Sequence, residues 1–263
     1  DVDSAKFEAY GTEGGAMAAI HRREGRLLAA FERSVAGRAD VSLFVSEAEA
    51  ELFRRRSGLE GADVRALQNG VDLDYYDPEA GFARIGEGGP LIVFTGQMDY
   101  APNIDAVRWF AGEVMPRLPE ARFAIVGRKP PEAVRRLAGP RVVVTGAVPD
   151  VRSWLAAADV VAAPLRIARG IQNKVLEAMA MARPVVASPA AFEGIEAEPG
   201  RHLLVAGTAE AQAEAINGLL GDPERARRLG EAARRRMEQA YRWEARLAPL
   251  AGIIGAAPRR AAA

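Results

Sequence analysis

The sequence lacks cysteine and contains only two histidines, His21 and His202, among its 263 residues. The absence of cysteine excludes disulfide bonds and thiolate metal sites, and it is typical of a reducing compartment. Because the two histidines lie far apart in the sequence, neither a histidine-based metal site nor a Ser/His catalytic triad is expected. We therefore expect chemistry that depends on no bound metal and no cofactor.

The chain also lacks net charge and any long apolar run. Lysine and arginine together number 35, as do aspartate and glutamate, so no single-sign field favours a nucleic-acid partner. No apolar run reaches the roughly 20 residues that a membrane-spanning helix needs. Hydrophobic residues make up 49% and charged residues 27%, which is the balance of a globular protein.

The first residues predict a chain that is cut short at its beginning. Val2 lies between two acidic residues, as at the end of a strand, and no signal-peptide pattern precedes it. Residues 4–40 carry apolar side chains at helical spacing. Short strands are expected over 41–45 and 64–67, with a helix over 47–56 that Ser46 caps. We expect residues 1–80 to be the remnant of an amino-terminal domain and the glycine-rich residues 81–90 to be a linker.

Short apolar strands alternate with helices over residues 91–240. Strands are expected at 91–95, 122–126, 142–145, 160–163, 184–187 and 203–205. Helices are expected at 104–115 with Asn103 as N-cap, 130–137, 151–157, 173–181, after Thr208, and from Pro223 behind Asp222. Because the strands are continuously apolar, the pattern predicts a parallel sheet covered on both faces. Such a sheet binds its ligand beyond the carboxyl ends of its strands. An amphipathic helix over 241–255 and a disordered tail over 256–263 complete the expected organisation.

Glycine follows three of the expected strands, at Gly96, Gly127 and Gly146. Such a glycine lets a ligand approach the backbone closely, or it simply permits a tight turn. One glycine alone favours the turn, whereas three at equivalent positions of one sheet favour a ligand crevice. Neither a Gly-x-Gly-x-x-Gly fingerprint nor a Walker motif occurs, so the sequence predicts neither a dinucleotide site nor a P-loop.

The segment after the strand 160–163 is the most informative. Gly170 ends a loop and a helix opens directly afterwards, so the free N–H groups of that helix predict an anion site. Lys174 lies in the first helical turn, where a cation opposes the helix dipole, and this placement is explained if Lys174 faces a phosphate. Glu177 lies on the same helix face and is placed to accept hydrogen bonds from sugar hydroxyls. The spacing alone is equally well explained by a solvated ion pair between Lys174 and Glu177.

These residues also carry a resemblance to a known family. Glu-Ala-Met-Ala at 177–180, followed by Pro-Val-Val-Ala at 184–187, resembles the donor-site signature of the retaining GT-B glycosyltransferases of family 4. Supporting similarity lies at 126–130, 144–151, 159–165, and at 69–72 with Tyr76 and Pro78. Within that family, residues 1–4, 46–50 and 169–183 resemble the sugar transferases of exosortase-linked (PEP-CTERM) exopolysaccharide loci.

The resemblance implies a fold and an activity. The fold would be of GT-B type, with one complete Rossmann-like donor domain, the remnant of a second Rossmann-like domain, and a final helix packing back across both. The activity would be transfer of a sugar, with retention, from a nucleotide-sugar co-substrate to a polysaccharide or lipid-linked acceptor in exopolysaccharide synthesis. We expect the protein in the cytoplasm. The arginines between Arg22 and Arg38 suit either peripheral contact with the inner membrane or a solvated helix face, which the interleaved glutamates favour.

The resemblance also assigns roles to residues. Glu177 would bind the donor ribose, and Gly170 and Ile171 would offer backbone N–H groups to the phosphates or the sugar. Val148 and Asp150 would flank the loop that reads the base. Further crevice residues would be Gly96, Gln97, Gly127 and Arg128. Asp3 is the only candidate for the acid near the reacting sugar, and a solvated carboxylate at the chain end is the simpler interpretation.

The sequence departs from the family pattern in two respects. The first of its two paired glutamates falls on Arg169, and its arginine and lysine after the first donor-domain strand fall near Gln97 and Pro102. Arg169 and Lys174 are candidate replacements for the missing cations, since a guanidinium matches phosphate geometry.

Two other functions remain as alternatives. A nucleotide-sugar epimerase uses the same fold but needs acid/base residues around the sugar, and the strand-end loops contain few. A non-catalytic nucleotide-sugar-binding module is the second alternative for a truncated chain.

Overall fold

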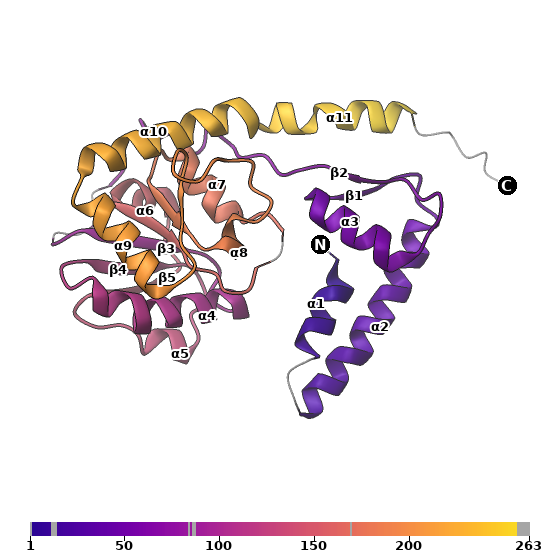
Figure 1. The fold of residues 1–263 in the computed structure, drawn as a ribbon, viewed down its shortest axis with the longest axis horizontal. Helices are drawn as coiled ribbons and strands as arrows, with labels where there is room; N and C mark the ends of the chain where they lie inside the picture. The colour runs from indigo at the N-terminus through magenta and orange to yellow at the C-terminus, as the bar shows by residue number, and fades with distance from the viewer. Residues whose placement is uncertain (1, 12–14, 84, 86–87, 169, 257–263) are drawn as a thin grey trace. The chain divides into compact units, whose positions relative to one another are not determined.

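The computed structural model describes residues 2–11, 15–83, 85, 88–168 and 170–256 (Figure 1). The chain divides into two compact units. Residues 70–243 form the larger unit, and the described parts of residues 1–69 and 244–263 form the smaller. The α/β class and the parallel sheet that the sequence predicted are confirmed.

The larger unit is built on a six-stranded parallel sheet. Its strands are β3 (Leu91–Thr95), β4 (Arg122–Val126), β5 (Val142–Gly146), β6 (Val160–Ala163), β7 (Val185–Ala187) and β8 (Leu204–Val205). Their order across the sheet is β5-β4-β3-β6-β7-β8, and every neighbouring pair is parallel. All residues of β3 and β6 are buried, because helices cover both faces of the sheet and continuously apolar strands suit that position.

Helices lie on both sides of this sheet. They are α4 (Ala101–Trp109), α5 (Glu132–Arg135), α6 (Val151–Ala157), α7 (Asn173–Ala180), α8 (Pro189–Phe192), α9 (Ala209–Leu220) and α10 (Pro223–Ala240). A π-helical turn (Phe110–Val114) and a 3-10 turn (Met115–Arg117) extend α4. Figure 1 shows α4 and α5 on one side of the sheet and α10 on the other.

Helix starts follow the capping residues, with one correction. The side chains of Asp150, Thr208 and Asp222 accept backbone N–H groups as predicted. Asn103 is not an N-cap, because α4 begins at Ala101 and Asn103 lies inside it. Pro102 explains the earlier start, since proline is tolerated in the first helical turn, where its missing N–H group costs nothing.

The smaller unit contains mostly helix. It comprises α1 (Asp3–Tyr10), α2 (Ala16–Ala36), β1 (Ser42–Phe44), α3 (Glu47–Ser57), β2 (Val64–Ala66) and nearly all of α11 (Trp243–Ala256). Strands β1 and β2 pair in parallel. Ser46 caps α3 by accepting the Glu49 N–H group, as predicted. The Glu32 carboxylate accepts from the Ser4 amide (3.0 Å) and hydroxyl (2.7 Å), which ties α2 to α1.

Two expectations for the beginning of the chain differ from the structure. Val2 is not in a strand, because its carbonyl accepts the Ala5 N–H group at 3.1 Å and so opens α1. Asp3 is the first residue of that helix, where a carboxylate complements the helix dipole.

Residues 70–80 lie with the larger unit, although the sequence placed them in the first domain. The Val71 amide donates to the Tyr241 carbonyl at 2.7 Å, and both Val71 and Leu73 are buried in the large core. The segment 81–90 therefore lies inside this unit rather than at its boundary.

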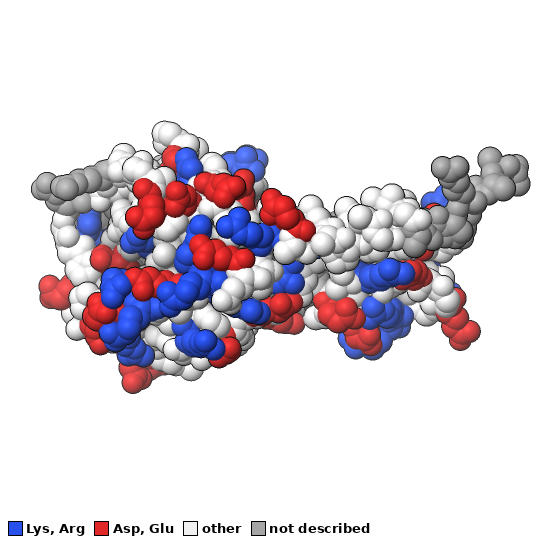
Figure 2. All heavy atoms as spheres, turned by 90° about the horizontal axis from the view of Figure 1, so that it is seen from above, with Lys and Arg blue, Asp and Glu red and all other residues white. Residues whose placement is uncertain are grey.

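The surface carries mixed charge. Figure 2 shows basic and acidic side chains interspersed over the face that it presents, and on α10 Arg227 pairs with Glu224 and Glu231. Among the described residues, no helix is long and apolar enough to cross a membrane.

Candidate donor site at the sheet switch point

The strand order reverses between β3 and β6, and a cavity lies beyond the carboxyl ends of these strands. From β3 the sheet continues through β4 to β5 on one side and from β6 through β7 to β8 on the other. Ligands of open parallel sheets bind at such a switch point. The cavity has a volume of about 710 Å³. Its lining comprises Tyr76, Thr95, Gly96, Gln97, Asn103, Val126, Gly127, Arg128, Ala147, Val148, Val151, Asn173, Lys174 and Glu177.

The floor of the cavity is main chain. A Cβ atom on Gly127 would lie 1.6 Å from the Gly96 carbonyl oxygen, and one on Gly96 would lie 2.8 Å from the Asn103 side-chain nitrogen. Gly127 thus permits close approach of the loop that carries Gly96, and Gly96 permits close approach of the Asn103 side chain. Gly146 is different, because it has a φ of +70° and open space around its α-carbon. It serves the turn.

Lys174 and Asn103 form one wall of the cavity. Lys174 donates a hydrogen bond from Nζ to Asn103 Oδ1, and Nζ lies 4.7 Å from the centroid of the Phe94 ring. Asn103 is buried and donates from Nδ2 to the Gln97 carbonyl at 2.9 Å. Burial lowers the pKa of Lys174 to about 8, and the charge of Glu177 opposes part of that shift. The ammonium group is therefore inside the site, not on a solvated helix face.

Glu177 and Tyr76 also line the cavity. Burial raises the pKa of Glu177, whereas the neighbouring Tyr76 hydroxyl and the charge of Lys174 lower it. Burial and the neighbouring Glu177 charge raise the pKa of Tyr76, so the Tyr76 hydroxyl stays protonated.

Exposed side chains form the rim. Arg128 Nη2 donates to Gln97 Oε1 at 2.9 Å, which links the loops after β3 and β4. Gln97 in turn donates from Nε2 to Asp99, and Lys129 pairs with Asp99 at 3.3 Å.

The two residues predicted beside the base loop differ in position. Val148 lines the cavity. Asp150 does not, since its carboxylate caps α6 and pairs with Arg152 at 2.7 Å, which holds the pKa of Asp150 below its usual range. Arg152 also lies 3.9 Å above the Tyr75 ring and donates to the Tyr75 carbonyl at 2.9 Å.

Some predicted residues lie elsewhere. Gly170 has a φ of +66°, Ile171 is buried in the core, and neither lines the cavity. Asp3 belongs to the smaller unit. Arg169 lies outside the described residues.

The structure adds lining residues to those predicted. Thr95 ends β3, and its buried hydroxyl has no hydrogen-bond partner among the described residues. A buried unsatisfied hydroxyl is costly, so a ligand at this point would relieve it. Thr95 follows from the strand-end rule, because it directly precedes Gly96. Tyr76 comes from a segment before the first strand, where that rule gives no signal.

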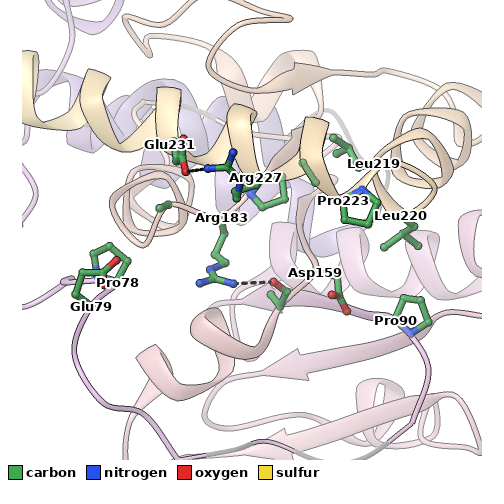
Figure 3. Close-up of a pocket in the computed structure, with 14 residues that line it drawn as sticks. Pro78, Glu79, Pro90, Asp159, Arg183, Leu219, Leu220, Pro223, Arg227 and Glu231 are labelled. Carbon is green, nitrogen blue, oxygen red and sulfur yellow. Dashed lines mark hydrogen bonds and ion pairs between the residues drawn. The ribbon is translucent and has the colours of Figure 1, made fainter.

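A second, smaller cavity of about 450 Å³ lies at the opposite edge of the sheet (Figure 3). Pro90, Asp159 and Pro184, which directly precede β3, β6 and β7, line it. Its cations are engaged, since Arg183 donates to the Met181 and Ala158 carbonyls and Arg227 pairs with glutamates. Within the described part of the chain, no group of three or more His, Asp or Glu side chains is arranged to hold a metal.

Comparison with known families agrees with this geometry. Residues 89–222, about half of the chain, match the model of the family described as "Glycosyl transferases group 1". The chain belongs to this family. It is 31% identical over 244 residues to the GDP-mannose-dependent alpha-(1-6)-phosphatidylinositol monomannoside mannosyltransferase of Mycolicibacterium smegmatis, covering 84% of this chain and 64% of that protein. It is 30% identical to the alpha-maltose-1-phosphate synthase of the same organism, covering 81% of this chain and 62% of that protein.

Two solved structures share the fold. Sucrose-phosphate synthase from Thermosynechococcus elongatus superposes with a TM-score of 0.71 at 22% identity, covering 88% of this chain and 61% of that one. Anabaena HepE in complex with UDP-glucose superposes with a TM-score of 0.69 at 18% identity, covering 88% and 68%. The chain thus spans somewhat less than two thirds of the length of the first two curated relatives.

Proposed function

We propose that the chain supplies the donor site of a glycosyltransferase. The enzyme would take a sugar from a nucleoside diphosphate sugar and transfer it, with retention, to a saccharide or lipid-linked acceptor. We assign the reaction to exopolysaccharide synthesis at the cytoplasmic face of the inner membrane, following the subfamily resemblance. The nucleotide sugar is a co-substrate.

The observation that carries this proposal is the cavity at the switch point. It brings a half-buried cation, Lys174, and a carboxylate, Glu177, together with the close-packed backbone at Gly96 and Gly127. The floor also presents the unsatisfied Thr95 hydroxyl. A diphosphate needs a cation, and a ribose needs a strong acceptor. The cavity provides both kinds of group.

The chemistry follows from these charges. When the bond between sugar and diphosphate breaks, negative charge develops on the leaving diphosphate. Lys174 and the positive end of the α7 dipole would stabilise that charge, since both are fixed before the ligand binds. Glu177 would hold the ribose through its hydroxyl groups.

The test is calorimetric titration with UDP, GDP and ADP. We expect at least one of them to bind with a dissociation constant well below 1 mM and the matching nucleoside to bind more weakly, because Lys174 acts on the phosphates. Arg227→Gln, a charge removal outside the cavity, is the matched control and should leave the affinity unchanged. Lack of binding of all three nucleotides at millimolar concentration would exclude the donor site.

A further inference from the structure

The Thr95 side chain is a buried polar group at the end of β3. Thr95 is 4% exposed and lines the cavity at the switch point, and its hydroxyl has no hydrogen-bond partner among the described residues. Burying a hydroxyl without a partner costs free energy, and such groups are few in folded proteins. Because the hydroxyl lies at a cavity, a ligand can supply the missing partner.

Thr145 shows that a threonine near the end of another strand of this sheet can satisfy its own hydroxyl. Thr145 lies in β5, directly before Gly146, as Thr95 lies directly before Gly96. Its Oγ1 donates to the Gly146 carbonyl at 2.8 Å, and it is not among the residues that line the cavity. The unpaired hydroxyl is therefore a property of Thr95 and not of the strand end as such.

The alternation of side chains along β3 places Thr95 on the face opposite to Lys174. Successive residues of a strand point to opposite faces of the sheet. The Lys174 ammonium group lies 4.7 Å from the centroid of the Phe94 ring, and a Cβ atom on Gly96 would lie 3.3 Å from it. Phe94 and Gly96 thus share the face that Lys174 approaches, and Thr95 between them faces the other way.

The topology identifies the helix that covers the Thr95 face. The connection from β3 to β4 and the connection from β5 to β6 run in opposite directions across the sheet. Right-handed crossovers therefore place their helices, α4 and α6, on opposite faces. A Cβ atom on Gly96 would lie 2.8 Å from the side-chain nitrogen of Asn103 in α4, so α4 covers the Gly96 face. Helix α6, which packs against β3, covers the face of Thr95.

The part of the cavity beside α6 has an uncharged lining. Val151 is the first residue of α6, and it lines the cavity together with Ala147 and Val148 from the preceding loop. Apolar side chains and one free hydroxyl suit an uncharged ligand group that carries hydrogen-bonding edges. A nucleoside has this chemistry, whereas a diphosphate needs a cation such as Lys174.

We propose that the Thr95 hydroxyl binds the nucleoside half of the donor, on the opposite face of β3 from the cation that binds its phosphates. The proposal deepens the proposed function and rests on it. A hydroxyl both donates and accepts, so it can pair with a ribose hydroxyl or with the edge of a base. The hydroxyl is unpaired in the free protein, and nucleoside binding would complete it.

The experiment titrates Thr95→Val and the wild type with three ligands. They are the nucleoside diphosphate that binds best among UDP, GDP and ADP, its nucleoside, and inorganic pyrophosphate, the last two measured by competition against the first. Valine keeps the shape of threonine and removes the hydroxyl. We expect an equal loss of about threefold to tenfold for the nucleoside and the nucleoside diphosphate, which corresponds to one neutral hydrogen bond. The affinity for pyrophosphate should not change.

Thermal melts of the ligand-free variants separate binding from folding. Thr95→Val should melt at or above the wild-type temperature, because no hydrogen bond within the protein is lost. Thr95→Ser keeps the hydroxyl but removes a buried methyl group, so it should melt lower and bind the nucleoside as the wild type does. Stability and affinity thus change in opposite directions in the two variants, which a purely structural role would not produce.

Thr145→Val is the matched control. It removes a hydroxyl that is paired within the protein, so it should melt below the wild type and leave the affinity for all three ligands unchanged.

The outcomes distinguish this proposal from the donor site itself. If the wild type binds a nucleotide but Thr95→Val keeps its nucleoside affinity, or loses pyrophosphate affinity equally, the nucleoside role is wrong and the donor site stands. A melting temperature of Thr95→Val below that of the wild type would show that the hydroxyl is paired within the protein, which also overturns the role. If the wild type binds none of the three diphosphates, the donor site is wrong, and the role of Thr95 falls with it.

Discussion

Lys174 shows at the residue scale how a protein places a charge where local structure disfavours it. The first turn of a helix repels a cation, and burial lowers the pKa of this one to about 8. The protein offsets the cost with a hydrogen bond that Lys174 donates to Asn103 Oδ1 and with the Phe94 ring. A bound diphosphate would turn the same placement into an advantage.

We therefore predict that nucleoside diphosphate affinity falls as the pH rises through about 8. Below this pH Lys174 is charged before the ligand arrives, whereas above it binding must take up a proton, so affinity should drop by up to tenfold per pH unit. Calorimetry between pH 7 and 9.5 measures this change. Lys174→Met should bind more weakly and show a flat profile, and identical profiles for the two proteins would contradict the assignment.

The same shift has an opposite effect on the stability of the free protein. The unfolded state keeps the ordinary lysine pKa of 10.5, so between about pH 8 and 10.5 it binds more protons than the folded state. The contribution of Lys174 to the free energy of unfolding thus rises with pH in that window.

The sequence predicted part of this residue-scale detail. The conflict between Lys174 and its helix dipole identified a phosphate ligand candidate, but the spacing equally allowed a surface pair with Glu177. Deciding between the two required Asn103, which accepts a hydrogen bond from Lys174. Asn103 is distant in sequence from α7, and no local pattern connects it with that helix.

At the element scale, α10 packs against the turn that follows α7. A Cβ atom on Gly230 would lie 2.1 Å from the Ala182 carbonyl oxygen, so a side chain there would push the two elements apart. This contact also sets the position of Arg234, one turn further along α10.

We predict that Gly230→Ala lowers the free energy of unfolding by about 1–3 kcal/mol or more, which is the cost of overpacking. Gly218→Ala in α9 is the matched control, because its Cβ atom would meet only the end of a flexible arginine at 3.5 Å. Better helix propensity should make it neutral or more stable by about 0.5–1 kcal/mol. Denaturant titration of both variants gives the comparison, and equal effects would refute the packing argument.

Elements were the best predicted level of the structure. Strands β3, β4 and β6 have the predicted bounds, since a doubly covered strand is largely apolar and stands out in the sequence. Helix α8 was missed because four residues carry no period. The start of α4 was misplaced because Asn103 has the chemistry of a cap, while Pro102 before it already marked the first turn.

At the scale of the whole molecule, the first and last residues of the larger unit lie next to each other. The Val71 amide binds the Tyr241 carbonyl, so the two ends of residues 70–243 are joined by a hydrogen bond. All residues that line the donor cavity lie between them.

We predict that residues 70–243 expressed alone unfold in one cooperative transition and bind the nucleotide as tightly as the full chain, within about twofold. Residues 81–243, which begin at the linker expected from sequence, are the control. They lack Val71, Leu73 and Tyr76 and should melt at a lower temperature and bind more weakly. Equal stability and affinity of the two fragments would contradict the boundary at residue 70.

The structure places the boundary of the larger unit at residue 70, whereas the sequence predicted a linker over 81–90. Glycines over 81–90 have the composition of a linker, and composition locates flexible chain rather than the limits of a core. Val71 and Leu73 pack in the large core through contacts with distant residues, which no local window contains.

The close packing of backbone at Gly96 and Gly127 has a consequence for how this cavity could change. Gly96 and Gly127 admit no side chain, so the depth of the site is fixed. Gln97 and Arg128 on the rim are exposed and bind mainly each other. Substitutions there alter the chemistry that a donor meets without disturbing the core. Substitutions are thus tolerated at Gln97 and Arg128 but not at Gly96 and Gly127. A search for variants with new donor preferences should randomise the rim residues first.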